Sequence, residues 1–99
     1  MKEPDQCKNM ADIREAIDHI DQEIVRNIAF RAQYVKAAAR FKTSEHAVKD
    51  EDRVKSVLES KRRLAQEYGI PPDLISNIYE MMIGFFINEE MDEWKKAGG

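Results

Sequence analysis

Apolar residues recur every three or four positions along most of the chain, a spacing that predicts a few long amphipathic helices. The first such stretch, residues 12–41, contains no proline or glycine. Its apolar residues fall on one helix face and are Ile13, Ile17, Ile20, Ile24, Ile28 and Val35. About thirty residues at 1.5 Å each give a rod of roughly 45 Å, whereas a compact chain of this length has a radius of gyration of about 13 Å. We therefore expect a partner that covers this apolar face.

A polar stretch at 43–49 interrupts the pattern, and two further helices are predicted after it. Thr43 and Ser44 have hydroxyls that compete for backbone groups, so this stretch is predicted to be a loop. Gly69 suits the left-handed position just beyond a helix end, and the two prolines that follow it suit the first turn of the next helix. The predicted helices cover about 10–42, 50–68 and 71–96, which makes the fold all-α.

Composition and charge narrow the class of protein. The 99 residues include 42% hydrophobic and 35% charged residues, with a net charge of −3, which predicts one globular domain over 1–99 without a basic field for nucleic acid. No apolar run approaches the ~20 residues of a membrane span, and the N-terminus lacks the apolar core of a signal peptide. The lone cysteine, Cys7, suits a reducing compartment. We therefore expect a cytoplasmic protein with neither nucleic acid nor membrane as a partner.

Metal and thiol chemistry find little support in the sequence. His19 and His46 are distant from each other and lack acidic residues at ligand spacing, so no metal site is predicted. Cys7 lies near an N-terminus that is expected to fray, and no nucleophilic role is predicted for it.

Basic residues near the predicted apolar faces suggest a site for an anion. Arg31 follows Ile28 by three residues and so lies on the buried face of the first helix, and Lys42 falls within about 20° of that face. Inward cations are costly unless they are paired or solvated. Arginine and lysine side chains can also reach water from apolar surface, so an ordinary structural role stays open for both residues, and more so for Arg14 and Arg53.

Glu90 is an acidic residue on the apolar face of the last predicted helix. It follows Ile87 by three residues and precedes Trp94 by four. A carboxylate in that position has a raised pKa or faces a cation. The alternative is that Glu90 lies at the edge of the stripe and contacts water or a surface lysine.

Taken in order, these residues resemble the all-helical chorismate mutase family. The likeness starts at 11–21, Ala-Asp-Ile-Arg-Glu-Ala-Ile-Asp-His-Ile-Asp, and continues through Arg31, 35–42, 52–54 and 83–90. It covers nearly the whole chain at consistent spacing. The resemblance implies an intertwined homodimer, because Arg14 and Arg31 lie about 25 Å apart along one helix and cannot both reach one small substrate. Arg14 would then act across the interface.

Within this family the sequence is most similar to the isochorismate pyruvate lyases of salicylate and siderophore biosynthesis. Typical mutases place a glutamate after the arginine that matches Arg53 and use it to hold a ring hydroxyl; Val54 cannot accept that hydrogen bond. Asp50 matches a mutase-like polar residue, so a chorismate mutase is an alternative function. A mutase that acts on an amino-substituted chorismate is a further alternative. A non-catalytic helical interaction module is the alternative from another class.

The resemblance also implies a site and its chemistry. Isochorismate would give salicylate and pyruvate in a concerted elimination without a cofactor, so the protein supplies a bound conformer and electrostatic stabilisation. Lys42 would face the ether oxygen. Glu90 replaces the family's usual glutamine and could donate a hydrogen bond only when protonated, so higher activity at acidic pH is expected. The implied catalytic residues are Lys42 and Glu90, and the implied substrate-binding residues are Arg14, Arg31, Arg53, Val35, Ile83 and Ile87.

Overall fold

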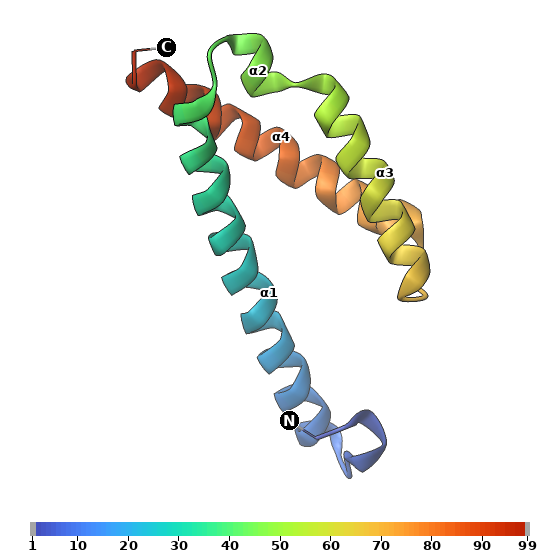
Figure 1. Cartoon of the computed structure of the whole chain (residues 1–99). Helices are drawn as coiled ribbons and strands as arrows, with labels where there is room; N and C mark the ends of the chain where they lie inside the picture. Colours follow the sequence, from blue (N-terminus) through green and yellow to red (C-terminus); the bar gives the residue numbers. More distant parts are fainter. Residues whose placement is uncertain (1, 99) are drawn as a thin grey trace. The chain divides into compact units, whose positions relative to one another are not determined.

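The computed structural model describes residues 2–98, and within them every regular element is a helix (Figure 1). Three long helices confirm the predicted all-α class. The elements in chain order are the 3-10 helix η1 (Pro4–Gln6), α1 (Met10–Ala38), the 3-10 helix η2 (Ala39–Phe41), α2 (Glu45–Lys49), α3 (Glu51–Glu67) and α4 (Pro72–Lys96). The chain divides into two compact units, one up to Tyr34 and one from Val35 onward.

The first unit consists of a short N-terminal segment and most of α1. The Asn9 side chain accepts a hydrogen bond from the Asp12 N–H at 2.9 Å, and the Asp12 carboxylate accepts one from the Lys8 N–H at 3.0 Å. These bonds satisfy backbone donors that a helix start leaves without partners. Lys2 adds an ion pair to Asp12, with its Nζ 3.1 Å from Oδ2. The helix therefore has a defined beginning at Met10.

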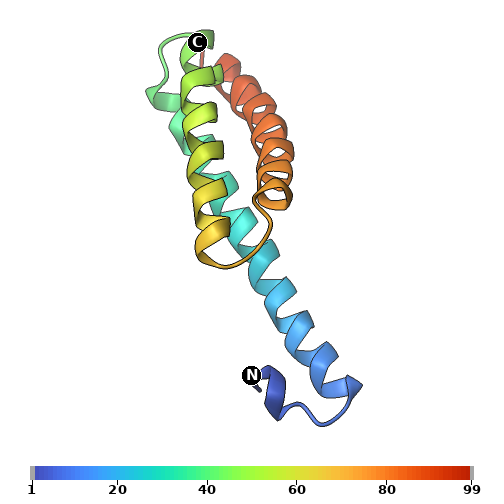
Figure 2. The same ribbon diagram turned by 90° about the vertical axis from the view of Figure 1, so that its right-hand side faces the viewer.

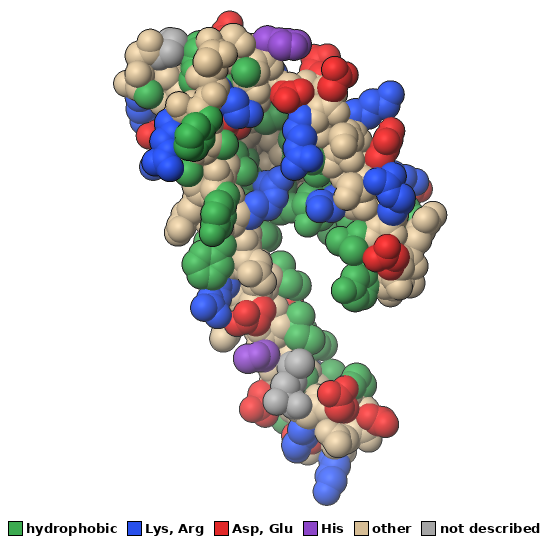
Figure 3. Space-filling model, viewed as in Figure 1, with side chains coloured by type: hydrophobic (Ala, Val, Ile, Leu, Met, Phe, Trp, Pro, Cys, Tyr) green, Lys and Arg blue, Asp and Glu red, His purple; other side chains and the backbone are tan. Residues whose placement is uncertain are grey.

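The middle of the apolar stripe of α1 is exposed. Ile17, Ile20 and Ile24 are 49%, 45% and 51% exposed, and Figure 3 shows hydrophobic side chains at the surface along much of α1. Scattered surface hydrophobes are ordinary, but a continuous apolar face on a helix is typical of an interface. The predicted apolar stripe is present, and within residues 2–34 its isoleucines are half-buried or exposed.

The second unit is built on an antiparallel hairpin of α3 and α4, which lie side by side (Figure 2). Gly69, with φ +71°, follows α3 as predicted. The N–H groups of Gly69 and Ile70 donate to the carbonyls of Gln66 and Ala65 at 3.1 and 2.9 Å, the pattern of a left-handed helix cap that glycine favours. Arg62 and Asp73 join the two helices with an ion pair of 2.8 Å.

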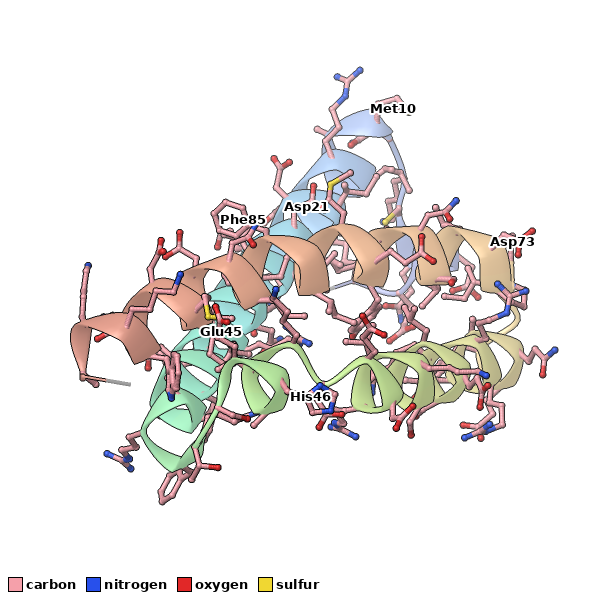
Figure 4. All side chains as sticks on the ribbon, turned by 90° about the horizontal axis from the view of Figure 1, so that it is seen from above. Met10, Asp21, Glu45, His46, Asp73 and Phe85 are labelled. Atoms are coloured by element: carbon pink, nitrogen blue, oxygen red, sulfur yellow. The ribbon has the colours of Figure 1, made fainter. Side chains whose placement is uncertain are left out.

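The core of this unit lies between α4 and the elements packed on it. Its buried residues are Ala39, Val48, Ala65, Ser76, Ile83, Glu90 and Met91. The opposite face of α4 carries a second exposed apolar stripe at helical spacing, made of Leu74, Ile78, Met81 and Phe85. Figure 4 shows Phe85 on the side of α4 away from α3.

The largest differences from the predicted elements lie between residues 39 and 49. The first α-helix ends at Ala38 and tightens into a 3-10 turn before Lys42, a common way for helices to end. The predicted loop at 43–49 contains α2. Ser44, taken as a sign of a loop, is instead the residue that begins α2, because its hydroxyl accepts a hydrogen bond from the Ala47 N–H at 3.1 Å.

No helix among the described residues is both long enough and apolar enough to span a bilayer.

Candidate active site

One face of α4 carries the buried acidic residue that the sequence singles out. Ile83, Ile87, Glu90 and Trp94 fall within about 60° of one another at 100° per residue. Glu90 is only 5% exposed, so it lies within the apolar stripe and not at its solvent-exposed edge. Burial raises the pKa of the Glu90 carboxyl above its ordinary value of 4.5, and the nearby Lys42 ammonium opposes that rise only in part. The expected raised pKa and the expected facing cation are therefore both found.

Lys42 directs its ammonium toward this carboxylate. Its Nζ lies 3.7 Å from Glu90 Oε2, and only 27% of the Lys42 side chain is exposed. The same Nζ donates a hydrogen bond of 3.0 Å to the Ala47 carbonyl in α2. A separation of 3.7 Å is an ion pair but too long for a hydrogen bond, and within residues 2–98 no donor reaches the buried Oε2 within hydrogen-bond range. The pair thus retains an unused acceptor beside a cation.

Trp94 contacts Lys42 in a way that the sequence analysis did not foresee. Its indole Nε1 donates a hydrogen bond of 3.0 Å to the Lys42 carbonyl. The sequence placed Trp94 on an apolar stripe, which accounts for its ring but not for its N–H. The chemistry of tryptophan indicates that its N–H bonds to an acceptor when the ring is packed against other residues. The spacing of residues does not identify that acceptor, because it lies 52 residues away.

The start of α3 carries Arg53, Val54 and Asp50. Arg53 is exposed in the first turn of α3, and Val54 is half-buried beside it. The Asp50 carboxylate accepts a hydrogen bond of 3.1 Å from the Arg53 backbone N–H, which makes Asp50 the N-cap of α3. Capping of α3 thus accounts for Asp50, the residue that resembles a polar residue of the mutases.

Arg14 and Arg31 both belong to the first unit, seventeen positions apart on α1. At 1.5 Å per residue this separation is about 25 Å. Arg14 is exposed near the helix start, whereas Arg31 is half-buried, in keeping with its predicted place on the stripe. Arg14 also lines a shallow surface hollow with Ala11, Glu15, Asp18, His19 and Gln22.

Of the predicted site residues, the structure brings Lys42 and Glu90 into contact. Ile83 is buried and Ile87 half-buried on the same face of α4 as Glu90, while Val35 is half-buried in the last turn of α1. Chemically, the pair can offer two hydrogen-bond donors to one oxygen when Glu90 is protonated, beside apolar surface. Such a group stabilises negative charge that develops on an oxygen.

The comparisons with known proteins establish the family. A model described as chorismate mutase type II matches residues 13–91, a range that includes every residue the sequence assigned to the site. The chain therefore belongs to the chorismate mutase type II family, as the resemblance in its sequence predicted. It is also 40% identical to an isochorismate pyruvate lyase of Pseudomonas aeruginosa, over the whole of this chain and 98% of that relative.

Proposed function

We propose that this chain is an isochorismate pyruvate lyase, which converts isochorismate to salicylate and pyruvate. The observation that carries the proposal is the Lys42–Glu90 pair, held at 3.7 Å on a buried face of α4, in a chain that is 40% identical along its full length to a relative of that name. Glu90, whose pKa is raised by burial, and Lys42 lie beside the apolar side chains of Ile83 and Met91, which are also buried on α4.

In the proposed reaction the protein acts by orientation and charge. The C–O bond between the enolpyruvyl group and the ring breaks as a ring hydrogen moves to the enol carbon, which yields pyruvate and the aromatic product. Lys42 faces the ether oxygen and stabilises the charge that develops there. Arginines suit the two carboxylates of the substrate because of their bidentate fork; we assign this role to Arg14 and Arg31, with Arg53 as a helper. Val35, Ile83 and Ile87 contribute apolar contacts around the ring.

We also propose that the active form is a homodimer in which Arg14 acts across the interface. The exposed apolar stripe of α1 and the exposed stripe of α4 each support the proposal, since a two-fold symmetric pair buries the same surface of both chains. The 25 Å between Arg14 and Arg31 along one helix supports the same arrangement. A cytoplasmic location is proposed as well, because the free thiol of Cys7 fits a reducing compartment.

Product analysis tests the function directly. We expect the purified protein to convert isochorismate to salicylate and pyruvate in equal amounts, followed by salicylate fluorescence and a coupled pyruvate assay. Chorismate mutase is the second candidate, favoured by the family model itself; prephenate from chorismate, without salicylate from isochorismate, would replace the lyase by the mutase. Turnover of neither substrate would leave an amino-substituted chorismate or a non-catalytic helical module.

The pH dependence of the lyase should reflect Glu90. Because the pKa of Glu90 is raised, the carboxyl becomes protonated as pH falls through a value above 4.5, and only the protonated form donates a hydrogen bond to the ether oxygen. We therefore expect kcat to be higher at pH 5 than at pH 7.5, and Glu90→Gln, which donates at every pH, to show a nearly flat profile. Steady-state kinetics of both proteins across this range provide the check. A Glu90→Gln enzyme slower than the unmodified one at every pH would refute the assignment.

A further inference from the structure

The backbone of Lys42 is fixed on both sides. Its N–H donates a hydrogen bond of 3.2 Å to the Ala39 carbonyl, which closes η2. Its carbonyl accepts the bond of 3.0 Å from Trp94 Nε1. Lys42 itself has left helical geometry, with φ −88° and ψ 140°, so its carbonyl has no place in the helical hydrogen-bond pattern. The contact with Trp94 fixes this carbonyl, in addition to the η2 bond at the N–H.

Two ion pairs also join α4 to residues on either side of Lys42. Glu93 pairs with Lys36, and Lys95 pairs with Glu45, each at 3.9 Å between side chains that are largely exposed. Exposed ion pairs of this length contribute little and are screened by salt. The bond from Trp94 joins neutral groups and is partly buried, so salt does not weaken it in the same way. Of these three polar contacts from α4, it is the one best able to hold the Lys42 main chain in place.

Trp94 and Glu90 are four residues apart on α4 and so lie on the same face, one turn apart. One turn of helix therefore contacts Lys42 twice: Glu90 faces the ammonium, and Trp94 holds the carbonyl. A shift of the Lys42 main chain away from Trp94 moves the base of the side chain whose ammonium faces Glu90 and donates to the Ala47 carbonyl. The two contacts together fix both ends of this residue relative to α4.

We propose that Trp94 is a positioning residue of the lyase: its indole N–H holds the Lys42 main chain so that the ammonium reaches the ether oxygen. This inference rests on the proposed function. Trp94 does not touch the substrate in this scheme and acts through Lys42. Small displacements of a reacting group cost rate steeply, by about a hundredfold for 1 Å, so partial loosening of Lys42 lowers kcat more than it alters substrate binding.

The hydrogen bond can be tested without substrate, because Trp94 is the only tryptophan in the chain. Its single indole N–H resonance in a ¹H–¹⁵N spectrum should be protected from hydrogen exchange. The protection should persist in Lys42→Ala, since the acceptor is a backbone carbonyl. An indole proton that exchanges as fast as that of free tryptophan would overturn the inference, whatever the enzyme's activity.

The kinetic test removes the donor and keeps the ring. Trp94→Phe should lower kcat for isochorismate by about tenfold and change KM by less than about twofold. Replacing the sole tryptophan by 3-benzothienylalanine, which carries sulfur in place of N–H, should give the same loss in a side chain of nearly unchanged shape. Replacement by 5-fluorotryptophan, which keeps the N–H, is the matched control and should retain kcat.

The outcomes distinguish a failure of the positioning role of Trp94 from a failure of the proposed lyase activity. If the unmodified enzyme turns over isochorismate and the benzothienyl protein matches it in kcat, the positioning role is wrong and the lyase stands. If the unmodified enzyme does not turn over isochorismate, the lyase and the positioning role fail together. A loss of kcat in both donor-free proteins, with the fluorinated protein active, supports the role of Trp94.

Discussion

Replacing Lys42 by alanine should lower kcat for isochorismate by about 10²–10³-fold, the usual cost of removing one donor from a charge-stabilising site. The ammonium pairs with the buried Glu90 carboxylate at 3.7 Å, and alanine removes this positive charge from the ether oxygen, where only protonated Glu90 could still donate a hydrogen bond. The α-helices should be retained, because Trp94 bonds to the main chain at this position. Steady-state salicylate formation measures the loss, and far-ultraviolet circular dichroism checks the fold.

Lys49→Ala is the matched control for this experiment. Lys49 is an exposed lysine in the last turn of α2, so its removal changes the net charge equally without touching the Glu90 pair. We expect it to keep kcat within about twofold, as is usual for surface substitutions. If Lys42→Ala were as active as Lys49→Ala, the catalytic role of Lys42 would be refuted, and Glu90 would lose its proposed partner in the reaction.

Mixing two inactive variants should restore about a quarter of the unmodified activity. In the proposed dimer, each site takes Arg31 from one chain and Arg14 from the other. A mixed dimer of Arg14→Ala and Arg31→Ala then contains one site with both arginines and one with neither. Random assortment makes about half of all dimers mixed, so about one site in four is complete. Equal amounts of the two proteins, unfolded and refolded together, provide the measurement.

A second mixture provides the control. Lys42 and Arg31 are assigned to the same site from the same chain, so a mixed dimer of Lys42→Ala and Arg31→Ala has one defect in each site and should recover nothing. Recovery in this mixture, or its absence in the first, would contradict the shared site. Analytical ultracentrifugation of each refolded sample shows whether dimers have formed, which separates failed assembly from a wrongly assigned arginine.

The sequence was sufficient for the helices because their pattern is local. Apolar spacing along α1, α3 and α4, together with Gly69 after α3, follows from the periodicity of each helix and the geometry of its end. Glu90 was predictable for the same reason: a carboxylate in the middle of an apolar stripe has few options, and the structure gives it burial and a cation.

The features that could not be predicted from the sequence depend on side chains with two possible local roles, or on contacts between residues far apart in the chain. Ser44 has a hydroxyl that can break a helix or begin one, and the choice depends on whether Ala47 presents its N–H. Lys42 and Trp94 are 52 residues apart, so their bond arises only when α4 folds back. The proposed site residues Arg14, Arg31 and Arg53 lie on exposed or half-buried helix faces, where spacing defines a direction but not a ligand.

Asp50 joins α2 to α3, bonds to both helices and adopts a positive φ. Its N–H donates a hydrogen bond of 2.7 Å to the His46 carbonyl of α2, its carboxylate caps α3, and its φ is +27°. Asparagine and aspartate tolerate such a φ better than other residues with a side chain, and both offer a capping oxygen. Glycine would relax the backbone and lose the cap, while alanine would lose the cap and keep the strain. This junction therefore favours aspartate or asparagine over glycine and alanine, because only the first two combine a capping oxygen with tolerance of this backbone angle.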